Sequence, residues 1–151
     1  MYVLDSNILV GYVRDAPYSH FVDQEYAPLD DANYCAVSVV TRGEILSAAY
    51  QFAWGERKRR TLVRILNDIT AIGLHPEIVD RYAEIDAYSQ NALPERPLED
   101  SDRNMGKNDI WIAATASVVD ATLITTDRDF DHLDGEFLDV LYVDPGAHPS
   151  A

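Results

Sequence analysis

Four carboxylates occupy sequence contexts from which they could support a metal-dependent reaction. Asp5 follows the apolar run that opens the chain, and Asp127 follows a second apolar run over residues 123–125. Glu44 and Asp109 each open a stretch with apolar residues at helical spacing. In a parallel sheet, ligands bind outside the carboxyl ends of the strands, where the following helices begin. We therefore interpret the four acids as one candidate site.

Carboxylates that lie this close together need a neutralising partner. Two unit charges about 4 Å apart interact by roughly 4 kcal/mol at an effective dielectric near 20. Mg²⁺ and Mn²⁺ prefer oxygen ligands. Such an ion can activate a water molecule and polarise a phosphoryl oxygen. The cluster of acids therefore predicts a site for a divalent cation that could hydrolyse a phosphate ester.

Each acid also has an ordinary structural explanation. Asp5 could cap the first helix, and Glu44 could complete a capping box with Thr41. Asp109 could complement a helix dipole, and Asp127 could begin a turn. Taken singly, the capping box is the better explanation for Glu44. These explanations do not account for all four positions falling at a single sheet edge.

The sequence offers no competing catalytic set. The four histidines lack metal-ligand spacing, and Cys35 lies in an apolar segment typical of a protein core. There is no glycine-rich phosphate loop, Gly-x-Ser-x-Gly motif or Cys-x-x-Cys pair. The acids therefore remain the main candidates for chemistry.

Composition favours one globular domain. The chain has 151 residues, of which 47% are hydrophobic, enough for a sizeable core. No apolar run is long enough to cross a bilayer, and residues 1–13 do not read as a signal peptide. The single cysteine, Cys35, excludes an internal disulfide. We expect a cytoplasmic protein with no membrane span.

Apolar periodicity predicts strands alternating with helices, which is typical of a mainly parallel sheet. The expected strands cover residues 2–4, 34–40, 69–74, 121–125 and 138–143. The expected helices cover 8–13, 17–29, 41–53, 57–68, 76–88 and 108–119. Residues 93–107 are irregular. We predict a single domain over residues 1–144 and a flexible C-terminal tail over residues 145–151.

Four motifs together resemble a known family. They are Val3-Leu-Asp-Ser-Asn, Thr41-Arg-Gly-Glu, Asn108-Asp-Ile-Trp-Ile-Ala-Ala and Leu123-Ile-Thr-Thr-Asp-Arg-Asp-Phe. In order and spacing they are similar to those of PIN-domain ribonucleases, in particular the VapC-like toxins of toxin–antitoxin modules. The resemblance covers nearly the whole chain. It implies an α/β fold, a PIN-like three-layer α/β/α sandwich around a central mainly parallel sheet.

The resemblance also implies roles for individual residues. Asp5, Glu44, Asp109 and Asp127 would be catalytic and would bind one or two Mg²⁺ or Mn²⁺ ions. Asn7, Thr125, Asn108 and Asp129 are the candidate supporting residues. Asn108 is expected to cap its helix, and Asp129 matches a more variable position and is expected to be solvated. Ser6 replaces the commoner Thr and retains the hydroxyl.

The implied activity is metal-dependent endoribonuclease cleavage of RNA by a toxin. The resemblance further implies a cognate antitoxin that blocks the site, and a homodimer or a toxin–antitoxin hetero-oligomer. Two alternatives stay open. One is a noncatalytic acidic binding module, and the other is a haloacid-dehalogenase-like phosphatase. The phosphatase class has an Asp-x-Asp pair after the first strand, and this chain has Asn7 at the second position.

Net charge complicates RNA binding, because it is −14. Five of the twelve basic residues fall within residues 57–64. Arg57, Lys58, Arg60 and Arg64 are therefore candidates for contact with RNA phosphates or with a protein partner. A solvated helix face explains the same cluster equally well.

Overall fold

The structure, a computed structural model, describes residues 1–99 and 101–148. Its strands are β1 (Tyr2–Leu4), β2 (Cys35–Ser38), β3 (Thr70–Ile72), β4 (Thr122–Thr125) and β5 (Asp139–Tyr142). Its α-helices are α1 (Ser6–Val13), α2 (Pro17–Tyr26), α3 (Val39–Gln51), α4 (Glu56–Asp68), α5 (Pro76–Ser89) and α6 (Lys107–Val118). Two 3₁₀ helices, η1 (Arg128–Leu133) and η2 (Pro145–Ala147), flank β5.

The five strands form one sheet in the order β3-β2-β1-β4-β5, and every paired neighbour is parallel. The expected mainly parallel α/β sheet is therefore confirmed. Because all five strands point the same way, their carboxyl ends share one edge. The strand order reverses between β1 and β4, which is where open α/β sheets bind ligands.

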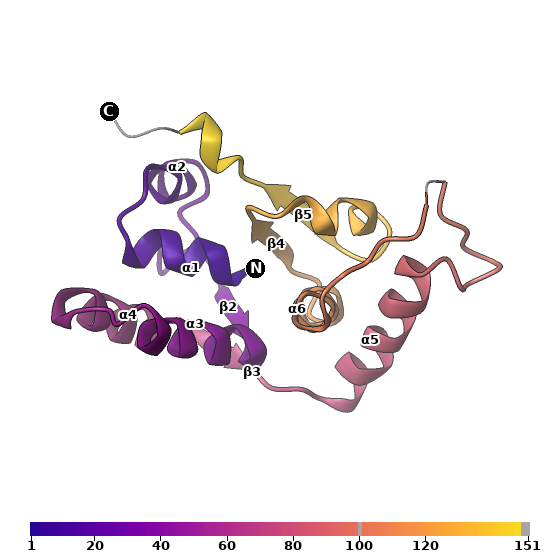
Figure 1. Cartoon of the computed structure of the whole chain (residues 1–151), viewed down its shortest axis with the longest axis horizontal. Helices are drawn as coiled ribbons and strands as arrows, with labels where there is room; N and C mark the ends of the chain where they lie inside the picture. The colour runs from indigo at the N-terminus through magenta and orange to yellow at the C-terminus, as the bar shows by residue number, and fades with distance from the viewer. Residues whose placement is uncertain (100, 149–151) are drawn as a thin grey trace.

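Alternate residues of the central strands supply two hydrophobic cores, one on each face of the sheet. Val3 and Leu123 pack with residues of α5 and α6. Leu4 and Ile124 pack on the other face with residues of α1 to α4. Figure 1 shows α5 and α6 grouped on one side of the sheet and α1 to α4 on the other. The result is the expected three-layer sandwich.

Helix α3 begins earlier than the sequence suggested. Ser38, and not Thr41, is its N-cap, because the Ser38 hydroxyl accepts a hydrogen bond from the Val40 N–H at 3.1 Å. Strand β2 consequently ends at Ser38, short of the predicted Val40. Thr41 is buried inside the helix. The predicted Thr41–Glu44 capping box is therefore wrong, which frees the Glu44 carboxylate for another contact.

Helix α2 ends at Tyr26, three residues before the predicted end. Ala27 adopts a left-handed conformation with φ 42°, and its N–H donates to the carbonyls of Val22 and Asp23. These bonds satisfy carbonyls that the helix end would leave without partners.

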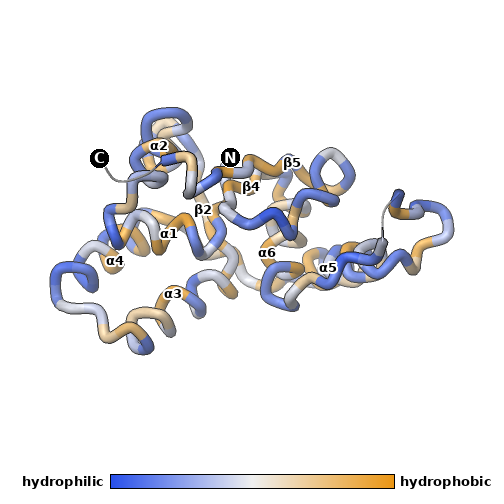
Figure 2. The backbone as a smooth tube through the Cα atoms, turned by 45° about the horizontal axis from the view of Figure 1, so that its top comes forward, coloured by the Kyte–Doolittle hydropathy of each residue, from blue (hydrophilic) through white to orange (hydrophobic). Residues whose placement is uncertain are grey.

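The segment between α5 and α6 contains no helix or strand in its described residues, as predicted for residues 93–107, except that Lys107 already belongs to α6. Figure 2 shows this segment extending away from the sheet, whereas hydrophobic residues concentrate along β4 and β5. Near the C-terminus, Pro145–Ala147 form η2, and the His148 ring stacks on Phe21 with centroids 4.2 Å apart. The rest of the predicted tail, residues 149–151, lies outside the described residues. No helix in the described ranges is long and apolar enough to span a membrane.

Candidate metal centre

Asp5 is fixed where β1 becomes α1. It caps the helix, since its Oδ1 accepts the Ser6 N–H at 2.7 Å. Its Oδ2 accepts the Thr125 hydroxyl at 2.7 Å. Thr125 is the last residue of β4, the strand beside β1, so this bond spans the point where the strand order reverses. Asp5 is only 4% exposed. Its carboxylate is therefore held rigidly at the floor of the site.

Glu44 reaches the same edge from α3. The Ser6 hydroxyl donates to its Oε1 at 2.8 Å, across 38 residues of sequence. Ser6 thus uses its backbone N–H for Asp5 and its hydroxyl for Glu44. The hydroxyl noted in the sequence is what ties the two predicted acids together.

Asp109, Asp127 and Asp129 form a compact acidic group among the residues that the structure describes. Each contributes one carboxylate oxygen to a set whose members lie within 4.8 Å of one another. Asp109 comes from the first turn of α6. Asp127 caps η1, because its Oδ1 accepts the Asp129 N–H at 2.8 Å. Asp129 was expected to be only a solvated acid; it is indeed exposed, yet it belongs to this group.

Electrostatics links the group to Asp5 and Glu44. Burial, together with the charges of Asp5, Asp127 and Glu44, raises the pKa of Asp109 to about 7. Burial raises the pKa of Asp5 as well, opposed by its hydrogen bonds from Thr125 and Ser6. A carboxyl whose pKa is raised by neighbouring carboxylates is one that a cation would stabilise in its ionised form.

The donor set fits a hard divalent cation. All the candidate ligands are carboxylate oxygens, the type that Mg²⁺ and Mn²⁺ prefer. Mg²⁺–O distances of about 2.0–2.1 Å put oxygens on opposite sides of an ion roughly 4.2 Å apart. The 4.8 Å span of the three Asp oxygens therefore needs only a small side-chain adjustment.

The predicted supporting residues divide into two groups. Thr125 binds Asp5 and also accepts the Asp127 N–H at 3.0 Å, so it connects two of the acids. Asn7 and Asn108 are exposed, and no side-chain hydrogen bond joins either to an acid in the described part of the chain. Asn108 is not the helix cap either, because Gly106 holds that position.

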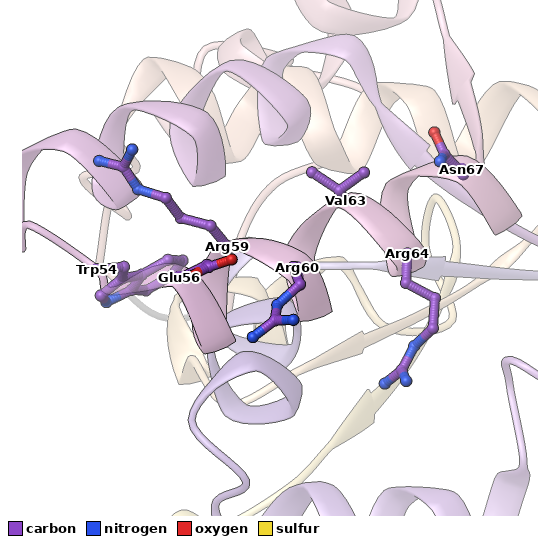
Figure 3. A pocket seen from close by; sticks show the side chains of 7 residues that line it. All are labelled: Trp54, Glu56, Arg59, Arg60, Val63, Arg64 and Asn67. Atoms are coloured by element: carbon purple, nitrogen blue, oxygen red, sulfur yellow. The ribbon is translucent and has the colours of Figure 1, made fainter.

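The basic residues lie on α4, away from the acids. Arg57, Lys58 and Arg64 line a cavity of about 430 Å³ against Tyr12 to Asp15, at the C-terminal end of α1. Asp5 caps the other end of that helix, whose eight residues span about 12 Å. Arg60 and Arg64 border a second cavity of about 630 Å³ beside Trp54, and Figure 3 shows them extending to the same side of α4.

The structure is thus a parallel α/β sandwich with a cluster of acids at the reversal of its strand order. A family model of the PIN domain matches residues 2–136. The chain therefore belongs to the PIN-domain family, as the sequence motifs predicted. No curated protein gave a match.

Solved structures share the fold. One such structure is VapBC2 from Rickettsia felis bound to a DNA fragment from its promoter. A chain of it superposes with TM-score 0.73 and 23% identity, covering 95% of this chain and 98% of that one. A chain of FitAcB from Neisseria gonorrhoeae superposes with TM-score 0.70 and 22% identity, covering 97% of this chain and 99% of that one. VapBC-5 from Mycobacterium tuberculosis is a member of the VapBC family of toxin–antitoxin systems. One of its chains superposes with TM-score 0.59 and 23% identity, covering 93% of this chain and 97% of that one.

Proposed function

We propose that this protein is a divalent-metal-dependent endoribonuclease that hydrolyses RNA phosphodiester bonds at the acidic site. The observation that carries the proposal is the convergence of Asp5, Glu44, Asp109 and Asp127 on one sheet edge. Membership of the PIN-domain family supports a nuclease activity. One or two Mg²⁺ or Mn²⁺ ions would activate the attacking water and polarise the scissile phosphate.

The chain's own residues divide the work. Asp109 and Asp127 would hold the cation together with Asp5, and Asp129 lies close enough to add a ligand. Thr125 and Ser6 fix the orientation of Asp5. Glu44 keeps Oε2 available while Oε1 accepts the Ser6 hydroxyl, so it can orient the attacking water or take its proton. Asp127 is the alternative for that role.

The phosphatase alternative loses support. Its second acid would stand at position 7, where this chain has an exposed Asn7 whose backbone carbonyl accepts the Tyr18 hydroxyl. The noncatalytic acidic module remains the competing explanation. It shares the same geometry and differs in predicting no cleavage.

We further propose that the protein is the toxin of a cytoplasmic toxin–antitoxin pair. The shared fold with chains from toxin–antitoxin complexes supports this role. A homodimer would use apolar residues left exposed on α3, such as Leu46 and Tyr50. Phe52, which caps the C-terminus of α3, is 58% exposed and could join this contact, whereas Ile45 is buried in the core.

The α4 cluster is our proposed contact for the antitoxin. It combines guanidinium groups with an apolar wall of Trp54 and Val63. The indole Nε1 of Trp54 is buried and has no hydrogen-bond partner among the described residues. Such a surface suits a peptide that carries carboxylates beside apolar side chains.

The test is cleavage of a pool of tRNA and other structured RNA by the purified protein. Reactions contain Mn²⁺, Mg²⁺ or EDTA, and wild type is compared with Asp5→Asn and Asp109→Asn. Asp80→Asn, which removes an exposed acid on α5, is the matched control. We expect discrete, EDTA-sensitive cuts from wild type and the control, and none from the two site variants.

Circular dichroism would establish that each variant is folded. Equal cutting by folded Asp5→Asn would exclude Asp5 from the catalytic set. Cation-stabilised wild-type protein that cuts no RNA in the pool would favour the binding module. Stabilisation by Mn²⁺ beyond the effect of ionic strength separates a metal site from a plain acidic surface.

A further inference from the structure

A basic residue, Arg128, stands next to two of the site acids in the sequence. Arg128 lies between Asp127 and Asp129 in sequence, and its side chain is 67% exposed. In a protein of net charge −14, an RNA strand approaching the acids meets repulsion on most of the surface. A cation here is in a position to offset that repulsion where the strand must bind.

The Arg128 guanidinium is held in a defined place. It lies over the Tyr142 ring, with Cζ 3.9 Å from the ring centroid. Its Nη1 also donates to Asp131 Oδ2 at 3.2 Å. An arginine has five N–H donors in a planar fork, so donors remain for a ligand. An exposed ion pair of this kind contributes little stability, and a phosphate can displace it.

Tyr142 gives the guanidinium a position relative to the acids. Tyr142 ends β5 and pairs in register with Thr125, whose hydroxyl binds Asp5. Neighbouring strands lie about 4.8 Å apart, so β5 is roughly 10 Å from β1 across β4. Arg128 therefore stands at the same sheet edge as the acids, displaced towards β5.

We propose that Arg128, oriented by Tyr142, binds a phosphate of the RNA strand next to the scissile one. The inference depends on the proposed nuclease function, because the ligand is its substrate. The planar guanidinium suits bidentate contact with a phosphate. Arg128 is thus a positioning residue that sets the path of the strand from the acids towards β5.

Arg96 provides a matched control for Arg128. Its guanidinium lies over an aromatic ring, Phe137, at 4.2 Å, and pairs with Glu136 at 3.0 Å. It comes from the segment between α5 and α6, and no contact joins it to the acids of the candidate metal centre in the described part of the chain. Arg96→Gln thus removes the same kind of charge and ring contact at a place where no phosphate is proposed.

The experiment measures the affinity of a short, fluorescein-labelled single-stranded RNA by anisotropy over a series of KCl concentrations. Ca²⁺ replaces Mn²⁺, and gels verify that the RNA stays intact. Removing one phosphate contact should reduce the slope of log K against log salt by about 0.7 for single-stranded RNA. We expect this reduction in Arg128→Gln, the wild-type slope in Arg128→Lys, and the wild-type slope in Arg96→Gln.

Stabilisation by Mn²⁺ is measured in parallel and should be equal in all four proteins. An Arg128→Gln slope equal to that of Arg96→Gln would overturn the phosphate contact while leaving the nuclease proposal intact. RNA binding absent from wild type would overturn both. A slope reduced equally in Arg128→Gln and Arg128→Lys, with lost thermal stability, would assign Arg128 a structural role and overturn the inference.

Discussion

The acidic site and the basic cluster of α4 are assembled in opposite ways. The acids come from four separate segments, and buried hydrogen bonds such as that from Thr125 to Asp5 fix them. The basic residues come from one helix and extend into solvent beside open cavities. Chemistry requires fixed geometry, whereas contact with a flexible partner requires mainly charge and area.

The two regions also differ in electrostatic strain. Burial and the neighbouring carboxylates raise the pKa of Asp109 and of Asp5, so the acidic site stores repulsion that a cation would relieve. The arginines of α4 also share one sign of charge, but they are exposed to solvent. Clustered like charge alone therefore does not mark a functional site, whereas like charge combined with burial does. Four predictions test this comparison.

The largest expected difference is between Glu44→Gln and Arg60→Gln. Both substitutions remove one charge and leave the neutral amide of glutamine in its place. Glu44→Gln should lower kcat/KM for RNA by more than about 100-fold, because a group that orients or deprotonates water is lost. Arg60→Gln should leave kcat/KM within about threefold, as expected for an exposed charge away from the chemistry. Equal losses in both variants would remove the distinction between the two regions.

Ser6→Ala should have the next largest effect. It removes the hydroxyl that holds Glu44 and leaves the backbone N–H that holds Asp5. Loss of a residue that orients a metal-site acid typically costs about 10- to 100-fold in activity. We expect a loss at the lower end, with kcat affected more than KM. Ser6→Thr, which keeps the hydroxyl, should retain activity, and a Ser6→Thr enzyme as impaired as Ser6→Ala would argue against this contact.

The double variant Arg57→Gln/Arg64→Gln sharpens the role of α4. Both side chains line the cavity against α1. If this face binds the antitoxin, the variant should weaken the complex roughly tenfold or more by isothermal titration, since each charge-assisted contact is worth about 1.5–3 kcal/mol. Cleavage of RNA by the free protein should change little. Weakened cleavage with an intact complex would reassign the face to RNA.

The smallest expected effect is on how the folding stability of the metal-free protein depends on pH. The pKa of Asp109 rises from its usual 3.8 to about 7 on folding. Between these values the folded protein binds more protons than the unfolded chain, so stability falls as pH rises. Asp109→Asn should flatten this dependence, whereas Asp80→Asn should not. Thermal melts in EDTA across this pH range measure it, and a steeper fall in Asp109→Asn than in wild type would contradict the assignment.

The fold was predictable because its signals are local. Apolar runs such as residues 2–4 and 121–125 mark buried strands, and Pro17 and Pro76 mark helix starts where the structure has them. The start of α3 was not predictable from the spacing of Thr41 and Glu44. Ser38 competes for the same role three residues earlier and is favoured because it is the last residue of β2, directly before α3 begins.

For the site, the sequence predicts which residues take part better than it predicts the contacts between them. The acids could be named from their positions after strands and at helix starts. The Ser6–Glu44 bond joins residues 38 apart, and no sequence pattern encodes such a tertiary contact. Asp129 was underestimated for a related reason. Its position depends on η1, which turns directly after Asp127 and brings the two carboxylates together.

The most direct test of the central claim is Mn²⁺ binding followed by electron paramagnetic resonance, with RNA cleavage measured on the same samples. Wild type and Asp80→Asn should bind Mn²⁺ and cut RNA in proportion to the bound ion. Folded Asp109→Asn should lose both together, because Asp109 belongs to the acidic group with Asp127 and Asp129 and has a pKa raised to about 7. Undiminished Mn²⁺ binding and cleavage by Asp109→Asn would contradict the account.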